Sequence, residues 1–400
     1  MRRRFKHVKL GDIVIKNGLQ TGPFGSQLKA EEFVSKGIPV VMPKNIKQGF
    51  ISCENIVRIS PYKAELLKKH KIISGDIIFS RRGDLKKIGI ATSYNNDWFC
   101  GTGCLRARVH KNIDSSFLHQ YVQIESVGNW LEKNALGQTM LNLNTKIISN
   151  LPVLLPPLAE QKAIAELLST WDKAIETTEK LITAKEEKFK WLLNKMICEN
   201  NEKIKYKKVI FGELIKERND RSKMQDQYPV LTSSRRGLFY QSDYFKKQVA
   251  SKNNSGYKIV CNGDFTYRAM SDDKKFTFNR LNFCDKGIIS PAYGVFNPVA
   301  IESNFLLYYL NSSIFHRKII KEIQGGTRVS FKLSTMKKMV VPVPPLEEQK
   351  KIAGVLTTAK KEIELLKELA DKYKIQKRGL MQKLLTGTWR IKPEIINQHK

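Results

Sequence analysis

The sequence lacks the motifs by which most nucleotide-dependent enzymes and metalloenzymes are recognised. Its 400 residues contain no P-loop, no GxGxxG turn and no HExxH pair, and the Asn/Asp-Pro-Pro-Tyr/Phe pattern of an amino-methyltransferase is missing. The six histidines are not spaced to pair with a serine or cysteine nucleophile, and no spaced set of carboxylates indicates a metal-dependent nuclease. We therefore expect no catalytic residues in this chain.

Long apolar runs and clustered cysteines are also absent. No run approaches the roughly 18 apolar residues that span a membrane, and no apolar signal core follows the basic start MRRRFKHVKL. The six cysteines are scattered, and Cys100 and Cys104 have no second Cys/His pair at metal-ligand spacing. We expect a cytoplasmic protein in a reducing compartment, with no metal site and no membrane partner.

Acidic residues are few, so the formal net charge is +32. Two segments are nearly neutral: residues 157–200 sum to −1 and residues 345–387 to +4, which leaves +29 on the rest. A field of this sign attracts polyanions, nucleic acid first. A lysine-rich composition bias would give the same charge, so charge alone does not decide the matter.

The two neutral segments are copies of one another, and the chain is organised around them. PPLAEQKAIAELLST begins at Pro156 and PPLEEQKKIAGVLTT at Pro344, 188 residues later, with ten of fifteen positions identical. A period of that length is too long for a solenoid unit and indicates a duplicated domain with its helix.

Both copies carry a 3.5-residue apolar repeat, which predicts a coiled-coil seam. Each helix would be ~40 residues and ~60 Å long. Two helices with one seam pattern in one chain are expected to pack on each other. The predicted seam residues are Ile164, Leu168, Trp171, Ile175, Ile182, Phe189, Ile352, Leu356, Ile363, Leu366, Tyr373 and Leu380.

The segments between the helices share a plan and differ in their loops. Gly263-Asp264 follows Gly75-Asp76 by 188 residues, and each pair predicts a turn that leads into a buried strand. A helix is expected near residues 117–131, and 37–51 and 228–240 each predict a strand, a loop and a strand. The loops PKNIKQG and TSSRRG differ, as do SRRGDLKK and YRAMSDDKK. Since recognition usually lies in loops on a rigid frame, each half is expected to recognise something different.

These motifs, together with TGPFGSQL, GDIIFSRRG and the closing LMQKLLTGTWRI, give the chain a resemblance over nearly its whole length. It resembles the specificity subunit of bacterial type I restriction–modification enzymes. The resemblance implies an α+β fold with two mixed α/β target-recognition domains. These would be separated by two long helices that form an antiparallel coiled coil, with a pseudo-two-fold internal repeat. The expected segments are 1–155 and 201–343 for the two recognition domains, and 156–200 and 344–400 for the central helix and the C-terminal helix with its tail.

The resemblance also implies a function and partners. Each recognition domain would read one half of an asymmetric bipartite target in double-stranded DNA. Modification subunits, which use S-adenosylmethionine, would dock on the helices, and restriction subunits, which use ATP and magnesium, would join the assembly. The chain itself would carry no cofactor and no catalysis, although the complex is a restriction endonuclease and DNA adenine methyltransferase. The TGPFGSQL contacts do not transfer to the second half, where residues 217–227 lack that loop.

Candidate DNA contacts are polar and basic residues of the loops, because lysines suit phosphates and arginine suits guanine. In the first half these are Phe24, Ser26, Lys44, Asn45, Lys47, Gln48, Arg81, Arg82, Lys86 and Lys87. In the second half they are Ser233, Ser234, Arg235, Arg236, Arg268, Lys274, Lys275, Arg328 and Lys332. We expect Phe24 to be loop core rather than a wedge between bases, and both Gly-Asp turns to be structural.

Two other functions stay open at this point. A helical scaffold with only nonspecific DNA contact would show a steep salt dependence without sequence preference. A stand-alone nuclease or methyltransferase would show activity as a single chain, against which the missing motifs count.

Overall fold

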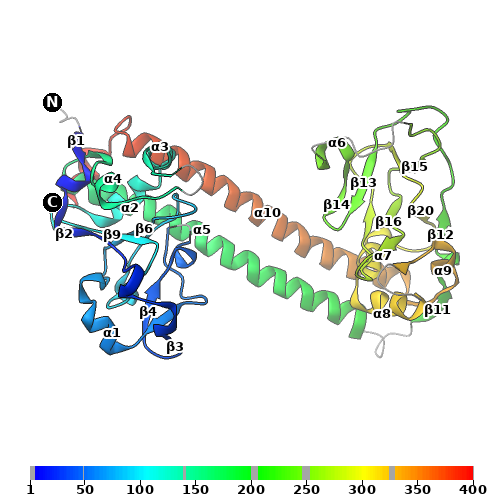
Figure 1. Cartoon of the computed structure of the whole chain (residues 1–400). Helices are drawn as coiled ribbons and strands as arrows, with labels where there is room; N and C mark the ends of the chain where they lie inside the picture. Colours follow the sequence, from blue (N-terminus) through cyan, green and yellow to red (C-terminus); the bar gives the residue numbers. More distant parts are fainter. Residues whose placement is uncertain are drawn as a thin grey trace. The chain divides into compact units, whose positions relative to one another are not determined.

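The structure is a computed structural model that describes residues 5–47, 49–137, 141–199, 206–245, 253–323 and 329–399. The chain forms two compact units, Met1–Thr178 with Leu369–Lys400, and Glu179–Glu368. Helices α5 (Leu158–Leu193) and α10 (Leu346–Leu385) each begin in one unit and end in the other (Figure 1). The predicted segment boundaries at 156, 201 and 344 stay a prediction.

The first unit contains two four-stranded sheets. One is antiparallel in the order β2-β9-β6-β7 (Val14–Thr21, Cys104–Val109, Ile77–Ser80, Ile88–Ile90). The other has the order β3-β5-β4-β8 (Phe33–Val34, Val57–Ile59, Ile38–Val41, Phe99–Cys100), in which β4 and β8 run parallel. Helices α1 (Pro61–Leu66), α2 (Ser115–Val122), α3 (Glu125–Asn134) and α4 (Thr145–Ser149) complete the unit.

One apolar core joins the first sheet of this unit to the long helices. Phe79 and Leu105 of the sheet pack with Phe117 of α2, Leu168 of α5 and Leu384 of α10. The first turns of α5 are therefore held by the domain itself.

The second unit is built around the antiparallel sheet β12-β20-β16-β18 (Ile215–Glu217, Tyr293–Pro298, Phe265–Arg268, Phe278–Arg280). Three strand pairs surround it: β13–β14 (Leu231–Ser234, Gly237–Tyr240), β15–β19 (Lys258–Cys261, Lys286–Ile289) and β17–β21 (Met270–Ser271, Val329–Ser330). Helices α6 (Gln241–Tyr244), α7 (Ser303–Leu310), α8 (Ser313–Glu322) and α9 (Leu333–Lys338) complete it. Its core is aromatic, with Phe265, Tyr267, Phe278, Phe296 and Phe315 buried together.

Each unit closes on a strand pair that leads into a long helix. β1 (Lys6–Lys9) pairs with β10 (Pro152–Leu155), and β11 (Lys207–Ile210) pairs with β22 (Val340–Val343). Just after β1 and β11, Leu10 N donates to Leu151 O and Phe211 N to Met339 O, both at 2.8 Å. The two acceptors are 188 residues apart, so the repeat in the sequence is a repeat in backbone geometry.

The glutamine of each PPLxEQ motif fastens the start of its helix. Gln161 Nε2 donates to Pro156 O, and Gln161 Oε1 accepts from Asp114 N, the residue that caps α2. Gln349 makes the same two bonds, to Pro344 O and from Glu302 N, which caps α7. The four distances are 2.8–2.9 Å. Since both glutamines are buried, this duplicated motif locks a helix to its own domain.

The long helices pair antiparallel within each unit. In the first unit Trp171 packs edge-on against Tyr373, with ring centroids 5.7 Å apart, and in the second Lys185 forms an ion pair with Glu362 at 2.6 Å. Every predicted seam residue is buried or half-buried. Ile164, Leu168, Ile352 and Leu356, at the start of each seam, lie in the domain cores.

Two local predictions are wrong. The single helix expected near residues 117–131 is two helices, because Ile124 is extended (ψ 148°) between α2 and α3. The second strand expected before residue 51 is only an isolated bridge between Ile46 and Ile51, because a tight turn at Pro43–Asn45 follows β4. The predicted hairpin at Gly75–Ala91 is confirmed as the antiparallel pair β6–β7. Among the described residues, no helix is apolar and long enough to cross a membrane.

Candidate nucleic-acid interface

The two Gly-Asp turns form the frame on which the candidate loops stand. Gly75 and Gly263 have φ of +88° and +89°, a conformation that favours glycine. The following aspartates, Asp76 and Asp264, are fully buried, and each accepts a hydrogen bond from a backbone N–H three residues upstream. Each turn is therefore structural, as the sequence predicts.

An arginine neutralises each buried aspartate, but it comes from a different strand in each unit. Arg108 of β9 grips Asp76 with Nε and Nη2 at 2.7 and 2.8 Å, whereas Arg218, which follows β12, grips Asp264. Its side-chain hydrogen bond with Asp264 raises the pKa of Arg218. These arginines hold the frame and are not free to contact DNA.

A glycine-rich junction brings three candidate loops of the first unit together. Thr102 Oγ1 donates to Pro23 O at 2.7 Å, which ties residues 101–103 to the TGPFGSQL loop. Gly103 O accepts from Arg81 N at 2.8 Å, and a side chain on Gly103 would meet Pro43 at 3.1 Å. The CGTGC segment therefore joins loops around residues 24, 43 and 81. In the sequence only its cysteines stood out, as possible metal ligands, whereas its two glycines were the missed signal.

Arg81 is the best-ordered candidate of that junction. Its Nε donates to Leu143 O at 2.7 Å, and its guanidinium lies 5.8 Å from the centre of the Phe24 ring. Burial, and then the charge of Arg82, lower the pKa of Arg81, although arginine stays protonated at neutral pH. Phe24 is 54% exposed, so the expectation that it is loop core is wrong; its ring covers Arg81 instead of an apolar interior.

The other first-half candidates divide by exposure. Ser26, Lys44, Lys47, Arg82, Lys86 and Lys87 are exposed. Lys47 lies 3.8 Å from Glu54, and Lys86 lies 3.2 Å from Glu132 of α3. Asn45 is fully buried, with its side chain bonded to Met42 N and Glu54 O, so its prediction as a DNA contact is wrong. Gln48 lies outside the described residues.

In the second unit, two candidate loops are tied directly to each other. Arg235 and Arg236 form the tip of hairpin β13–β14, since Ser234 pairs with Gly237. Arg235 Nη2 donates at 2.5 Å to Asp273, in the turn that carries the exposed Lys274 and Lys275. The structure therefore brings four predicted cations together on one surface, which we call the tip–turn surface (Arg235, Arg236, Lys274, Lys275).

The remaining second-half candidates do not all share this surface. Ser233 is buried and accepts from Asn279, so its prediction as a DNA contact is wrong; Ser234 is half-buried and bonded to the same Asn279. Arg268 is exposed at the end of β16, and Lys332 is exposed just before α9. Arg328 lies outside the described residues.

The two units place different side chains on one backbone. Arg81 N donates to Gly103 O, and Arg81 O accepts from Leu143 N; Ala269 makes the same pattern with Ala292 O and Phe331 N. Residues 81 and 269 are 188 apart, as are 143 and 331. The residue that carries a fixed guanidinium in the first unit is therefore an alanine in the second.

The titratable groups buried in the first unit are not arranged for catalysis. Burial raises the pKa of the Cys100 thiol to about 12 and lowers the pKa of both His70 and His119 to about 4. No three His, Cys, Asp or Glu side chains cluster as metal ligands within the described parts of the chain. What the candidate loops do present is positive charge and forked N–H donors, the groups that bind phosphates and base edges.

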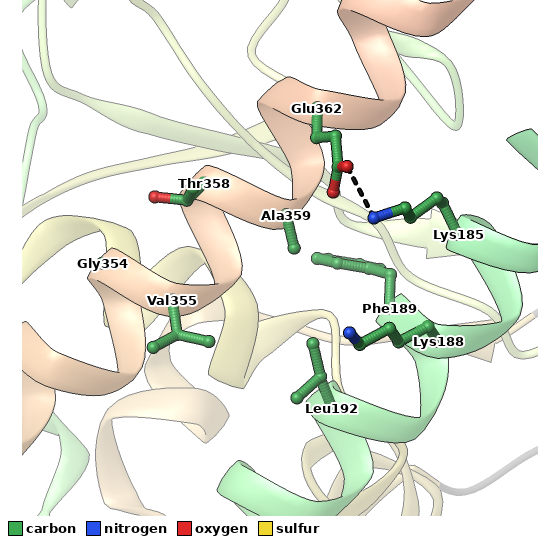
Figure 2. A pocket seen from close by; sticks show the side chains of 9 residues that line it. All are labelled: Lys185, Lys188, Phe189, Leu192, Gly354, Val355, Thr358, Ala359 and Glu362. Carbon is green, nitrogen blue, oxygen red and sulfur yellow. Dashed lines mark ion pairs between the residues drawn. The ribbon is translucent and has the colours of Figure 1, made fainter. Parts of the chain in front are cut away.

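The helix pair carries a second feature, a cavity of about 410 Å³ between α5 and α10 in the second unit. Figure 2 shows Phe189 and Leu192 of α5 pointing toward α10, where Gly354 and Ala359 fill little space. Ala359 is the repeat position of Trp171. The cavity therefore lies where the first unit has the large Trp171 ring.

Both long helices also expose a regular apolar stripe outside the seam. Leu167 and Leu181 of α5 are two heptads apart and exposed, and their repeat positions on α10, Val355 and Leu369, are exposed as well. Trp191 is a further exposed apolar side chain of α5, at 55% exposure. Exposed apolar side chains in heptad register are typical of a helix face that contacts another helix.

Comparison with known proteins agrees with this geometry. The model of the type I restriction modification DNA specificity domain matches the chain twice, over residues 3–186 and 212–372. A Methanocaldococcus jannaschii protein described as the putative specificity subunit of type I restriction enzyme MjaX is 26% identical, over 95% of this chain and 92% of its own. The MjaVIII specificity subunit of that organism is 22% identical, over 70% of this chain and 72% of its own.

Two solved structures share the fold. The type I restriction–modification S subunit from M. genitalium superposes with a TM-score of 0.56 at 14% identity, covering 95% of this chain and 96% of its own. A chain from a study of complex assembly and conformational transition of the type I R-M system gives 0.57 at 17% identity, covering 97% and 99%. Both confirm the fold of two mixed domains and an antiparallel pair of long helices.

The chain belongs to the family of type I restriction modification DNA specificity domains, of which it carries two copies. Its function is DNA target recognition as the specificity subunit of such a system. The helical scaffold with only nonspecific binding is not supported.

Proposed function

We propose that each unit reads one half of an asymmetric bipartite DNA target. The observation that carries this proposal is the shared backbone with different exposed side chains, Arg81 in one unit and Ala269 at the repeat position of the other. A common frame would approach DNA in one way, while different loop side chains would select different bases. Two different half-sites follow from two such units.

Lysines supply affinity and arginines supply sequence choice. Exposed lysines such as Lys44, Lys87, Lys274 and Lys332 would contact phosphates, whose neutralisation releases counterions. Arg81 in the first unit and the arginine pair of the tip–turn surface would reach base edges, where arginine binds guanine O6 and N7. The fixed frame arginines Arg108 and Arg218 take no part.

The outer apolar stripes would seat the modification subunits. Leu167 and Leu181 with their repeats Val355 and Leu369 offer two equivalent helix faces, which suits two copies of one partner. The cavity beside Ala359 would accept a large apolar side chain from the copy bound there. Restriction subunits would join that assembly. S-adenosylmethionine, ATP and magnesium would be bound by the partners, and this chain would be a non-catalytic cytoplasmic subunit.

The test is the pattern of methylated bases in cells that express the cognate modification subunit with or without this chain. A split motif that requires this chain would support the proposal and give both half-sites and the spacer. Unchanged methylation, together with binding that shows no sequence preference, would overturn it in favour of a scaffold.

A further inference from the structure

Arg235 is held by a carboxylate that is itself held in place. Asp273 Oδ1 accepts from Arg235 Nη2 at 2.5 Å, from Ser271 Oγ at 2.9 Å and from Lys275 N at 3.2 Å. The turn between Ser271 and Lys275 is closed by Lys274 at φ +63°. The carboxylate therefore has a fixed position before any ligand arrives.

The hairpin that carries Arg235 is fastened as well. Asn279 of β18 donates through Nδ2 to Ser233 Oγ and to Ser234 O, both at 2.8 Å. The hairpin stem is thus bonded to the edge strand of the main sheet, and its tip is bonded to the turn before that strand. Both ends of the Arg235–Asp273 bond rest on the same sheet.

The ion pair is nevertheless open to solvent, with side-chain exposures of 63% for Arg235 and 42% for Asp273. An exposed pair of this kind contributes little to folding stability. Partial burial raises the pKa of Asp273, but hydrogen bonds from Ser271 and the Lys275 N–H and the charge of Arg235 together lower it, so the carboxylate is ionised at neutral pH.

The pair also changes what Arg235 can offer to DNA. Asp273 cancels its charge locally, so Arg235 is a poorer phosphate ligand than Arg236, Lys274 or Lys275 beside it. Its planar guanidinium has five N–H donors, and the bond to Asp273 uses one. An oriented fork of remaining donors, with its side-chain entropy already lost, suits a base edge that accepts two parallel bonds.

We propose that Asp273 is a positioning residue that orients Arg235 to read one guanine in the half-site of the second unit. The inference rests on the proposed function, because it needs the second unit to read DNA. Among the bases, guanine presents two adjacent acceptors, O6 and N7, in the major groove, and that pattern matches the free edge of Arg235. Arg236 and the two lysines then contact the flanking phosphates.

The experiment uses the full chain with its cognate modification subunit and reads methylation over a library randomised in both half-sites. Arg235→Lys keeps the charge and removes the fork, so discrimination for one G·C pair should fall about 10-fold or more. Asp273→Asn keeps the size and removes the charge, so discrimination at the same pair should fall about 3- to 10-fold. The double variant should equal Arg235→Lys alone, because Asp273 acts only through Arg235.

Glu347→Gln is the matched control, since Glu347 forms an exposed 2.9 Å ion pair with Lys350 on α10, outside both loops. It should leave the motif unchanged. The inference is overturned if Asp273→Asn lowers methylation equally at all sites, if the changed position lies in the other half-site, or if the second half-site holds no G·C pair. A wild-type chain that gives no split motif would instead overturn the proposed function.

Discussion

The two units share their backbone hydrogen bonds and differ in what fills the positions between them. The Gly-Asp turn, the strand pair before each long helix and the glutamine at each helix start recur with nearly the same bonds. Where the first unit has Trp171, Arg81 and a buried Glu160, the second has Ala359, Ala269 and a half-buried Glu348. The frame is thus duplicated, while packing, charge and recognition have diverged on it.

The largest expected difference concerns the C-terminal tail. Glu160 is 1% exposed and is gripped at 2.5–2.6 Å by Arg390, which also lies over the Phe5 ring. Glu160→Ala would leave the Arg390 charge without this buried partner and should cost about 3–5 kcal/mol. Tryptophan fluorescence during urea unfolding measures this, since Trp98, Trp130, Trp171 and Trp389 all lie in the first unit.

Glu348→Ala at the repeat position is the control. Because Glu348 is only half-buried, its loss should cost under about 1 kcal/mol. Equal effects at the two positions would contradict the view that the tail gives the first unit a clasp of its own.

The seam should respond in opposite directions in the two units. Trp171→Ala removes a ring that packs on Tyr373 and should cost about 2–3 kcal/mol, less than a fully buried tryptophan because Trp171 is half-buried. Ala359→Leu fills part of the existing cavity and should be neutral or stabilise by ~1 kcal/mol. Thermal unfolding of both variants checks the pair; destabilisation by Ala359→Leu would mean that the cavity wall cannot accept a side chain.

The first unit should also be the more acid-sensitive one. His70 and His119 are buried and neutral, with pKa of about 4 against 6.5 when unfolded. Between these values the unfolded chain binds more protons, so stability is fully present above pH 6.5 and is lost as pH falls toward 4. At pH 5 each histidine should cost about 2 kcal/mol. Urea midpoints at pH 7 and pH 5 measure this, and a midpoint for the first unit that did not fall would contradict neutral burial.

The smallest effect should come from the exposed lysines. Lys274→Ala with Lys275→Ala should weaken DNA binding about equally on all sequences. It should also reduce the slope of log affinity against log salt by ~2, because each phosphate that a lysine no longer neutralises lowers the slope by about 0.9. Binding titrations at several salt concentrations measure this. A change in sequence preference with an unchanged slope would place these lysines at bases rather than phosphates.

The sequence predicted those features that local pattern and the repeat determine. The seam residues, both Gly-Asp turns and the hairpin at 77–90 follow from spacing, because a heptad or a glycine turn is recognisable without knowing its neighbours. The register of 188 also predicted that Phe305 would correspond to Phe117, and both stand in the first turn of capped helices.

The loop side chains could not be predicted in this way, because their contacts come from distant segments. Asn45 and Ser233 look like loop polar residues, yet each is buried against a partner 9 or 46 residues away. Phe24 looks like loop core and is exposed beside Arg81. Asp273 was not a candidate at all, since nothing near it in the sequence indicates that it binds Arg235, 38 residues before it.

The central claim, that each unit reads its own half-site, is tested most directly by exchanging residues 1–150 for those of another family member. The readout is the methylated motif of the hybrid in complex with the modification subunit. One half-site should change to that of the donor, while the other half-site stays as in the parent. A change in both half-sites would contradict the claim.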